Sequence, residues 1–168
     1  GGRTILHHRD ERLHGAAVAD LDRLLVDIDG VLADDHYPEF AAPICAAARR
    51  RGLPVVLDVE KRISAADPLW LATTHRIFSR SGLAAASTSE DLAEALGGFD
   101  GSDGAFLAVT DGARPVHWRS GNGGGQIQAF AVHAVDTLGA GDVFHGAFAF
   151  ALVETGDAVR ALRFAAAT

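Results

Sequence analysis

Residues 135–146 read Val-Asp-Thr-Leu-Gly-Ala-Gly-Asp-Val-Phe-His-Gly, and this stretch decides the fold of the chain. The residues that lead into it, 130–135, predict a strand. The residues that follow it, Val143–Val153, are so apolar that they predict a helix buried on most sides. A strand that passes through a tight turn of small residues into a helix is a building unit of α/β proteins.

The turn at the centre of this stretch has the residues that a phosphate site requires. Gly139 and Gly141 let the backbone come close to a ligand. The unpaired amides and the positive dipole end at the start of a helix attract an anion such as phosphate. Asp142 falls in the first helical turn, where the helix end favours its charged form, so it can accept the proton of an attacking hydroxyl. The segment therefore combines an anion site with a general base, as phosphoryl transfer requires.

Upstream of the turn, the pattern predicts a βαβ unit. A strand at residues 30–33 ends in the acids Asp34 and Asp35, a helix covers 40–51, and a second buried strand covers 54–58. The other expected elements are strands at 3–7, 76–79 and 104–110, helices at 68–74, 90–96 and 157–167, an exposed arm at 115–119 and a flexible turn at 121–125. Together they predict a single α/β domain over residues 1–168, with a mainly parallel sheet.

Composition excludes several classes of function. The 168 residues carry a net charge of −7, which argues against a nucleic-acid partner and gives no reason to expect a membrane surface as partner. Cys45 is the only cysteine, so neither an internal disulfide nor a cysteine zinc site can form, and we expect a cytoplasmic protein. The eight histidines lack the spacing of a zinc motif, and we predict no metal ligands in the chain. No apolar run approaches the roughly 20 residues of a membrane helix.

The segment from Asp136 to Phe144 resembles D-T-x-G-A-G-D-x-F, a signature of the PfkB family of carbohydrate kinases, which have the ribokinase fold. The resemblance implies a three-layer α/β/α fold and ATP-dependent phosphorylation of a sugar hydroxyl, with Mg²⁺ bound by the nucleotide. In this family the G-A-G-D turn is the anion hole and its aspartate is the catalytic base. Those roles fall on Gly139, Ala140, Gly141 and Asp142.

A second match lies at Val109-Thr110-Asp111-Gly112, which is similar to the V-T-x-G turn under the nucleotide in this family. The resemblance therefore implies that Thr110 and Gly112 bind nucleotide. Residues 54–58 resemble the family's P-V-V-L-D strand. Segments at 2–5, 31–34 and 77–79 are similar to the subgroup of ketohexokinases and sulfofructose kinases.

The chain departs from the family pattern in two ways. It resembles only the middle and later parts of family members, so we expect a fragment without the amino-terminal sugar-binding and lid part and without the carboxyl-terminal end. Because that lid commonly forms the family's dimers, a homodimer is an expectation for the full-length protein only. The N-x-x-E motif, which many members carry and which is linked to magnesium, is absent, since Asn122 has no glutamate three residues later.

Four further residues are candidates with two open interpretations each. Asp136 and Thr137 either contact the substrate or order the loop before the helix. Asp34 and His36 follow a strand at its carboxyl end, where open α/β sheets bind ligands, so they either contact the sugar or belong to a surface loop. His145, on the same helix face as Asp142, is interpreted as a packing histidine.

Three other functions compete with the kinase interpretation. Residues 25–32 resemble the nucleophile motif of haloacid dehalogenase-type phosphatases, with Asp27 as the nucleophile and Asp29 as acid and base, although no lysine or acidic pair stands in the expected order. Gly139-Ala140-Gly141 could belong to a dinucleotide-binding oxidoreductase, but Phe144 stands where the third glycine is required. A kinase-like fragment that binds nucleotide without turnover is the third alternative.

Overall fold

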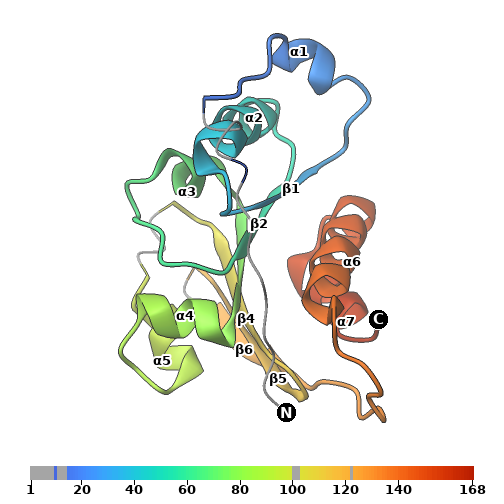
Figure 1. Cartoon of the computed structure of the whole chain (residues 1–168). Coiled ribbons are helices and arrows are strands. Elements are labelled where there is room, and N and C mark those ends of the chain that lie inside the picture. Colours follow the sequence, from blue (N-terminus) through green and yellow to red (C-terminus); the bar gives the residue numbers. More distant parts are fainter. Residues whose placement is uncertain (1–9, 11–14, 100–102, 122) are drawn as a thin grey trace.

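The computed structural model describes residue 10 and residues 15–99, 103–121 and 123–168. Its centre is a six-stranded sheet in which the strands lie in chain order from β1 to β6 (Figure 1). The strands are β1 (Val31–Asp34), β2 (Val55–Val59), β3 (His75–Ser79), β4 (Phe106–Asp111), β5 (Arg114–Ser120) and β6 (Gly123–Ile127). The first four are parallel to one another, whereas β5 and β6 are added antiparallel. The prediction of a mainly parallel sheet is therefore confirmed.

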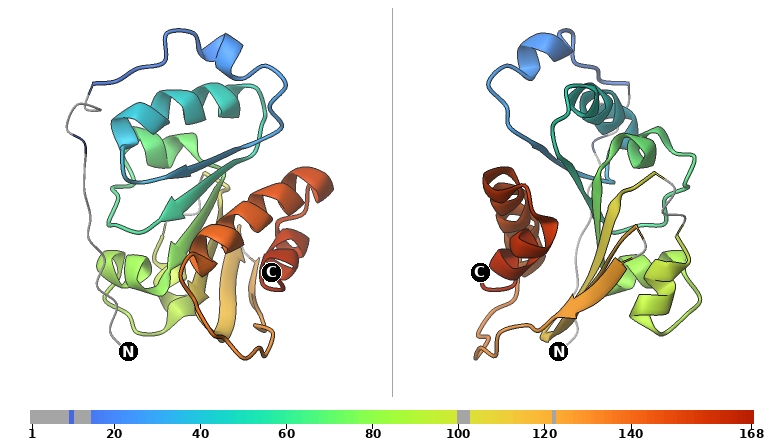
Figure 2. Two further views of the ribbon diagram at one scale, coloured as in Figure 1. Left: turned by 45° about the vertical axis from the view of Figure 1, so that its right-hand side comes forward. Right: turned by 180° about the vertical axis from the view of Figure 1, so that it is seen from behind.

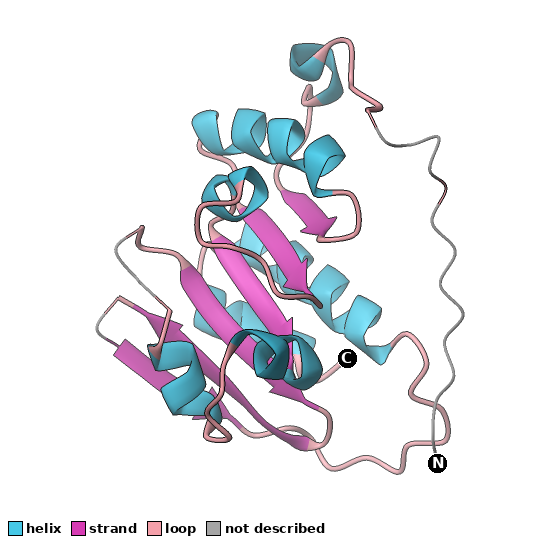
Figure 3. Cartoon of the chain, turned by 60° about the vertical axis from the view of Figure 1, so that its left-hand side comes forward, coloured by secondary structure: helices cyan, strands magenta, loops and turns pink. Residues whose placement is uncertain are grey.

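Helices cover both faces of this sheet and make three layers (Figure 2). They are α1 (Leu21–Leu24), α2 (Pro38–Arg50), α3 (Pro68–Ala72), α4 (Arg80–Ala86), α5 (Leu92–Gly97), α6 (Ala140–Thr155) and α7 (Ala158–Ala165). One apolar core lies under α2 to α5, and a second lies under α6 and α7 (Figure 3). This is the three-layer α/β/α arrangement that the sequence predicts.

The side chains of strand β2 alternate between the two faces of the sheet. Val55, Leu57 and Val59 point into the core under α2 to α5. Val56 points the other way, into the core under α6 and α7. Asp58 shares the face of Val56 because strand side chains alternate with a period of two. The last polar residue of this strand therefore faces helix α6.

Three expectations about the second half of the chain are wrong in whole or in part. Residues 123–125 of the flexible turn expected at 121–125 belong to β6. Residues 115–119, expected as an exposed arm of a hairpin, do form a hairpin strand in β5, but this strand lies inside the sheet between β4 and β6. Residues 130–135, expected as a strand, run as an irregular segment with Phe130 and Val135 exposed. A strand needs a neighbour to accept its hydrogen bonds, and the described residues give this segment none. The strand expected at residues 3–7 lies outside the described residues.

Arg76, at the start of β3, is a buried charge within the first core. Its guanidinium donates to the Trp70 carbonyl (2.7 Å) and the Thr73 hydroxyl (3.0 Å), and forms an ion pair with Asp103. It also lies 4.0 Å from the centre of the Trp70 ring. Because a buried guanidinium is tolerated only when it is paired, these contacts explain why a strand can begin with arginine inside the protein.

Gly82, in α4, lies directly against the backbone at the end of β2. A Cβ atom added there would lie 2.3 Å from the Val59 carbonyl oxygen, which is backbone and cannot move aside. We expect Gly82→Ala to lower the free energy of unfolding by about 3 kcal/mol, measured by urea denaturation. Gly97→Ala is the matched control, since its Cβ would meet only the Arg119 side chain at 3.8 Å. Equal stability of both variants would contradict this account of α4 packing.

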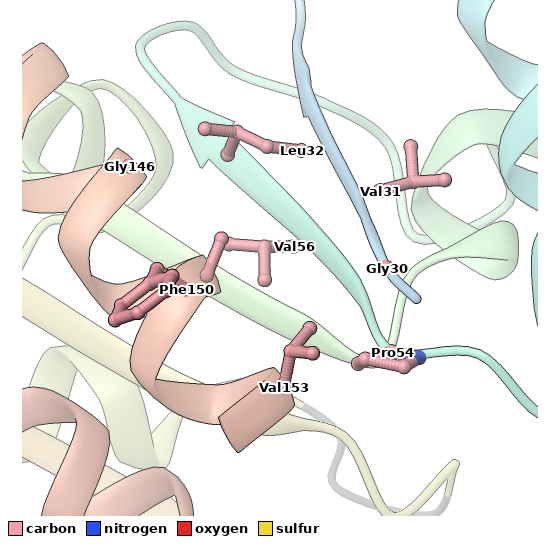
Figure 4. Close-up of a pocket in the computed structure, with 9 residues that line it drawn as sticks. Gly30, Val31, Leu32, Pro54, Val56, Gly146, Phe150 and Val153 are labelled. Carbon is pink, nitrogen blue, oxygen red and sulfur yellow. The ribbon is translucent and has the colours of Figure 1, made fainter. Parts of the chain in front are cut away.

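A shallow apolar groove of about 350 Å³ lies between β1 and α6 (Figure 4). Its lining includes Leu32 and Val56 from the sheet and Gly146, Phe150 and Val153 from the helix. The groove contains no charged side chain among these residues, so its chemistry differs from that of the turn at the start of α6. Within the described residues, no helix is both long and apolar enough to cross a membrane.

Candidate active site

The turn before α6 is built by its own hydrogen bonds. The Asp136 carboxylate accepts a hydrogen bond from the Leu138 amide (2.8 Å), and the Thr137 carbonyl accepts one from the Ala140 amide (3.3 Å). Gly139 then caps the helix with a φ of 76°, a left-handed conformation that glycine adopts without the cost of a side chain. The Asp136 carboxylate therefore makes a hydrogen bond within the loop, and whether it also contacts a substrate stays a prediction.

Asp142 lies in the first turn of α6 and is exposed to solvent. Its Oδ2 atom lies 3.8 Å from the point that a Cβ on Gly139 would occupy, so the carboxylate lies over the turn. A Cβ on Gly141 would meet nothing within 4 Å, which leaves open space beside the helix end. The first amides of an α-helix have no acceptor one turn earlier within the helix. Here the Ala140 amide donates to Thr137 and the Val143 amide to Gly139, which leaves the amides of Gly141 and Asp142 beside the open space.

The turn lies at the carboxyl edge of the parallel strands. His145 Nε2, one turn along α6, is 3.3 Å from Asp58 Oδ1 at the end of β2. Asp58 is also paired in register with Asp34 at the end of β1. Open α/β sheets bind ligands at this edge, and the start of α6 brings Asp142 to it.

The acidic residues at the end of β1 accept hydrogen bonds from the backbone of the neighbouring loops. Asp34 accepts a hydrogen bond from the His36 amide at 2.8 Å. The buried Asp35 accepts hydrogen bonds from the amides of Glu60 (3.0 Å) and Lys61 (2.7 Å), and so fixes the chain that leaves β2. The His36 ring lies between the carboxylates of Asp34 (3.3 Å) and Glu60 (3.8 Å). Asp34 and His36 therefore belong to an ordered acidic edge beside α6.

Asp58 is the most perturbed carboxyl group of this edge. Burial raises its pKa from the ordinary value of 3.8 to about 6. The nearby His145 acts against this shift, whereas the negative charges of Glu60, Asp35 and Asp142 add to it. Its environment therefore favours the protonated form near pH 6, unlike that of an exposed aspartate.

The raised pKa makes stability depend on pH in a defined direction. Because the folded pKa lies above the unfolded one, the stabilisation is complete below about pH 4 and is lost as pH rises through about 6. We expect the free energy of unfolding of the wild type, relative to Asp58→Asn, to fall by about 1–3 kcal/mol across this window. The measurement is urea denaturation at a series of pH values.

The comparison with Asp58→Asn is required because a second group acts in the opposite direction. Burial lowers the pKa of His75 to about 4, so its contribution is lost as pH falls from its ordinary value of 6.5. His75 is present in both proteins, and its effect cancels in the difference. A difference that stays constant with pH would show that Asp58 does not titrate in this window.

The turn after β4 carries the other predicted ligand contacts. The Thr110 hydroxyl donates to the Phe78 carbonyl (3.3 Å), and Gly112 has a φ of 59° in the tight turn between β4 and β5. Between them, Asp111 pairs with Arg80 (2.6 Å) and Arg114 (2.7 Å). Burial alone would raise the pKa of Asp111, but hydrogen bonds from these arginines outweigh burial and lower it. This turn is therefore held rigid by an ionised carboxylate.

The two predicted parts of the site lie on the same edge but are not in contact. Strand β4 is separated from β2 by β3, which places Thr110 roughly 10 Å across the sheet from Asp58. A nucleotide is long enough to bridge that separation. Among the described residues, no group of three or more His, Cys, Asp or Glu side chains could hold a metal ion.

The phosphatase alternative fails on position. Asp27 and Asp29 are exposed and lie before β1, at the amino end of the strands. The acidic edge and the helix start lie at the opposite end of the sheet, where ligands of such sheets bind. Asp58 is not among the residues that the sequence analysis proposes for the site. An acidic residue at the carboxyl end of a buried strand could have indicated it, because ligands bind at that edge of the sheet.

The geometry agrees with comparisons to known proteins. Residues 22–168 match the family described as pfkB family carbohydrate kinase. The chain belongs to this family. It is 29% identical to an ATP-dependent ribose-1-phosphate kinase of Halopiger xanaduensis over 144 residues, which are 86% of this chain and 48% of that protein. It is also 48% identical to the ribokinase of Bacillus subtilis over 61 residues, which are 36% of this chain and 21% of that protein.

A solved structure of a similar protein has the same fold as this chain. The crystal structure described as a ribokinase from Agrobacterium tumefaciens has a TM-score of 0.85 and 30% identity, and the match covers 99% of this chain and 56% of that one. The chain thus spans about half the length of these two relatives, which match most of it. These relatives are ribokinase-like, and the narrower resemblance to ketohexokinases and sulfofructose kinases is not confirmed by them.

Proposed function

We propose that the protein carrying this chain transfers the γ-phosphoryl group of ATP to a hydroxyl group of a sugar. The observation that carries the proposal is the turn at 139–142, where open space, helix-end amides and a carboxylate meet at the carboxyl edge of the sheet. Family membership supports the reaction class. The name of the ribose-1-phosphate kinase relative supports ATP as the donor.

In this proposal the turn binds the phosphates of ATP. The space beside Gly141 would receive the transferred group, since an added side-chain atom there meets nothing. Amides of the turn at 139–142 would stabilise the negative charge that develops on the phosphoryl oxygens, with Ala140 exchanging its bond to the Thr137 carbonyl for one to phosphate. Thr110 and Gly112 would lie beneath the rest of the nucleotide. Mg²⁺ would be held by the phosphates, where it neutralises charge as in phosphoryl transfer generally.

Asp142 would act as the general base. Its exposed carboxylate accepts the proton of the sugar hydroxyl while the hydroxyl oxygen forms a bond to the γ-phosphorus. The bond from that phosphorus to the bridging oxygen breaks, and ADP leaves with the electron pair. The side chains of Asp34 and His36 lie along the same edge and could accept hydrogen bonds from sugar hydroxyls. Because the relatives act on ribose or its phosphate by name, a pentose is the first substrate class to test.

The test is an ADP-release assay on the full-length protein with Mg²⁺-ATP and a panel of pentoses, hexoses and their phosphates. We expect sugar-dependent ADP release with at least one member of the panel. ATP binding by calorimetry without turnover on any sugar would favour the alternative of a nucleotide-binding, non-catalytic protein. Absence of both binding and turnover would contradict the proposal.

A further inference from the structure

His145 connects the proposed anion-hole turn to the sheet. The residue lies on α6, one turn after Gly141, and only 4% of it is exposed. Its Nδ1 atom is 2.7 Å from the Gly141 carbonyl oxygen, and its Nε2 atom is 3.3 Å from Asp58 Oδ1. One imidazole ring therefore contacts the backbone of the turn on one side and the end of β2 on the other.

These contacts determine which nitrogen atoms of the His145 ring carry hydrogen. A carbonyl oxygen can only accept a hydrogen bond, so Nδ1 of His145 must carry the hydrogen that lies toward Gly141. In a neutral ring Nε2 then has a lone pair, and this lone pair would face the carboxylate of Asp58. Nε2 is buried and has no hydrogen-bond partner of its own among the described residues. Repulsion is avoided only if one proton lies between Nε2 and Asp58, on either atom.

The surroundings favour retention of this proton. Asp58 is half-buried, with 16% of its side chain exposed, and this partial burial is the largest cause of its raised pKa. The charged or titratable groups around the pair are mostly acids: Asp34 at the end of β1, Asp35 after it, Glu60 after β2, and Asp142 on α6. His36 lies beside Asp34, and Lys61 lies 4.0 Å from Asp35. A site crowded with carboxylates disfavours one more negative charge.

We propose that Asp58 and His145 hold one shared proton and thereby position the anion-hole turn through the Gly141 carbonyl, an inference that rests on the phosphoryl transfer proposed above. The proton lets His145 satisfy both contacts at once. When the proton is lost, the ring must give up either Asp58 or the Gly141 carbonyl, and the turn that carries Asp142 loses one of its attachments. Turnover therefore falls as pH rises and this proton is lost.

Three substitutions separate the parts of this proposal. Asp58→Asn places an amide N–H where the protonated carboxyl would donate, and this donor does not titrate. His145→Asn keeps a donor one bond from Cγ, as Nδ1 is, so it can still reach the Gly141 carbonyl. His145→Phe removes both contacts but keeps the ring volume. Glu154→Gln, at the far end of α6, is the control for loss of an exposed carboxylate from the same helix.

The first measurement is kcat and KM for Mg²⁺-ATP in the full-length protein, from about pH 5.5 to about pH 8.5. We expect the wild type and Glu154→Gln to lose kcat on the alkaline side, and Asp58→Asn to lose this pH dependence. His145→Phe should lower kcat by about 10- to 100-fold because the reacting groups are misplaced. His145→Asn should recover most of that loss with a flat pH profile. A wild-type kcat and pH profile in His145→Phe, or an unchanged alkaline fall in Asp58→Asn, would overturn the proposal.

The second measurement does not depend on activity. Nitrogen-15 NMR of His145 should show Nδ1 bearing hydrogen throughout the pH range, and an Nε2 signal whose titration changes in Asp58→Asn. An Nδ1 without hydrogen would overturn the shared-proton pair even in an active kinase. A normal pair in a protein that transfers no phosphoryl group would overturn the proposed function, and with it the positioning role, while the pair itself would stand.

Discussion

Replacing Asp142 with asparagine is expected to lower kcat by about 10²- to 10⁴-fold, the usual contribution of a general base. Asparagine keeps the shape of the side chain but cannot accept the proton of the attacking hydroxyl. The carboxylate is exposed and lies over Gly139 rather than within a core, so its loss should leave the fold intact. The measurement is steady-state turnover of the full-length protein with Mg²⁺-ATP and its best sugar, alongside the unfolding midpoint.

The control must remove a carboxylate from the same helix without touching the turn. Glu154→Gln does so, since Glu154 is exposed near the carboxyl end of α6. We expect this variant to keep wild-type turnover and Asp142→Asn to keep wild-type affinity for Mg²⁺-ATP to within about threefold, because a base acts in the transition state. Wild-type kcat in Asp142→Asn would contradict the assignment of the base.

The sequence predicts most of the parallel half of the sheet because each element there carries its own signal. Strands β2 and β4 are short runs of buried residues, such as Val55–Val59, and the helix between β1 and β2 has the apolar spacing and basic last turn of a helix. The expected helix at 143–153 begins three residues earlier, at Ala140, since Gly139 supplies a left-handed cap that no periodicity reveals. Short α4 was not predicted, because Gly82 lies inside it and glycine is a poor helix former.

The antiparallel half could not be predicted from local patterns. Gly123, Gly124 and Gly125 favour a turn on propensity alone, yet they pair with β5 and complete the sheet. A Cβ on Gly125 would lie 3.2 Å from the Trp118 ring, so the glycine allows the aromatic side chain to lie flat against β6. A residue without a side chain is required there by its neighbour, and that requirement is visible only in three dimensions.

The candidate site also has one part that the sequence predicts and one part that it does not. The turn at 139–142 is contiguous in the chain, so its glycines and Asp142 could be assigned from one short segment. The contact between His145 and Asp58 joins residues 87 positions apart, and no local pattern in the sequence indicates that the two meet. His145 is interpreted from the sequence as a packing histidine, and its burial fits that interpretation, whereas its two polar contacts are the basis of the positioning role proposed above.

Gly141→Asp is expected to weaken binding of Mg²⁺-ATP by about 100- to 1000-fold. A side chain at this position projects into open space and meets nothing within 4 Å, so the variant should fold. A carboxylate placed about 4 Å from a phosphate at an effective dielectric constant of about 20 costs about 4 kcal/mol per unit charge. Each tenfold loss of affinity corresponds to about 1.4 kcal/mol, so even a partly screened repulsion reaches the lower end of this range. Calorimetric titration of the full-length protein gives the affinity directly.

Two variants show whether the loss comes from charge at the turn. Gly141→Ala adds only a methyl group in the same space and should weaken binding by about tenfold or less, since it brings no repulsion. Gly146→Asp adds the same carboxylate to the same helix, where an added Cβ also meets nothing, but at the apolar groove beside Phe150 (Figure 4). It should bind nucleotide far better than Gly141→Asp. Equal losses in the two aspartate variants would point to a general effect of negative charge on α6 and would remove the phosphates from the space beside Gly141.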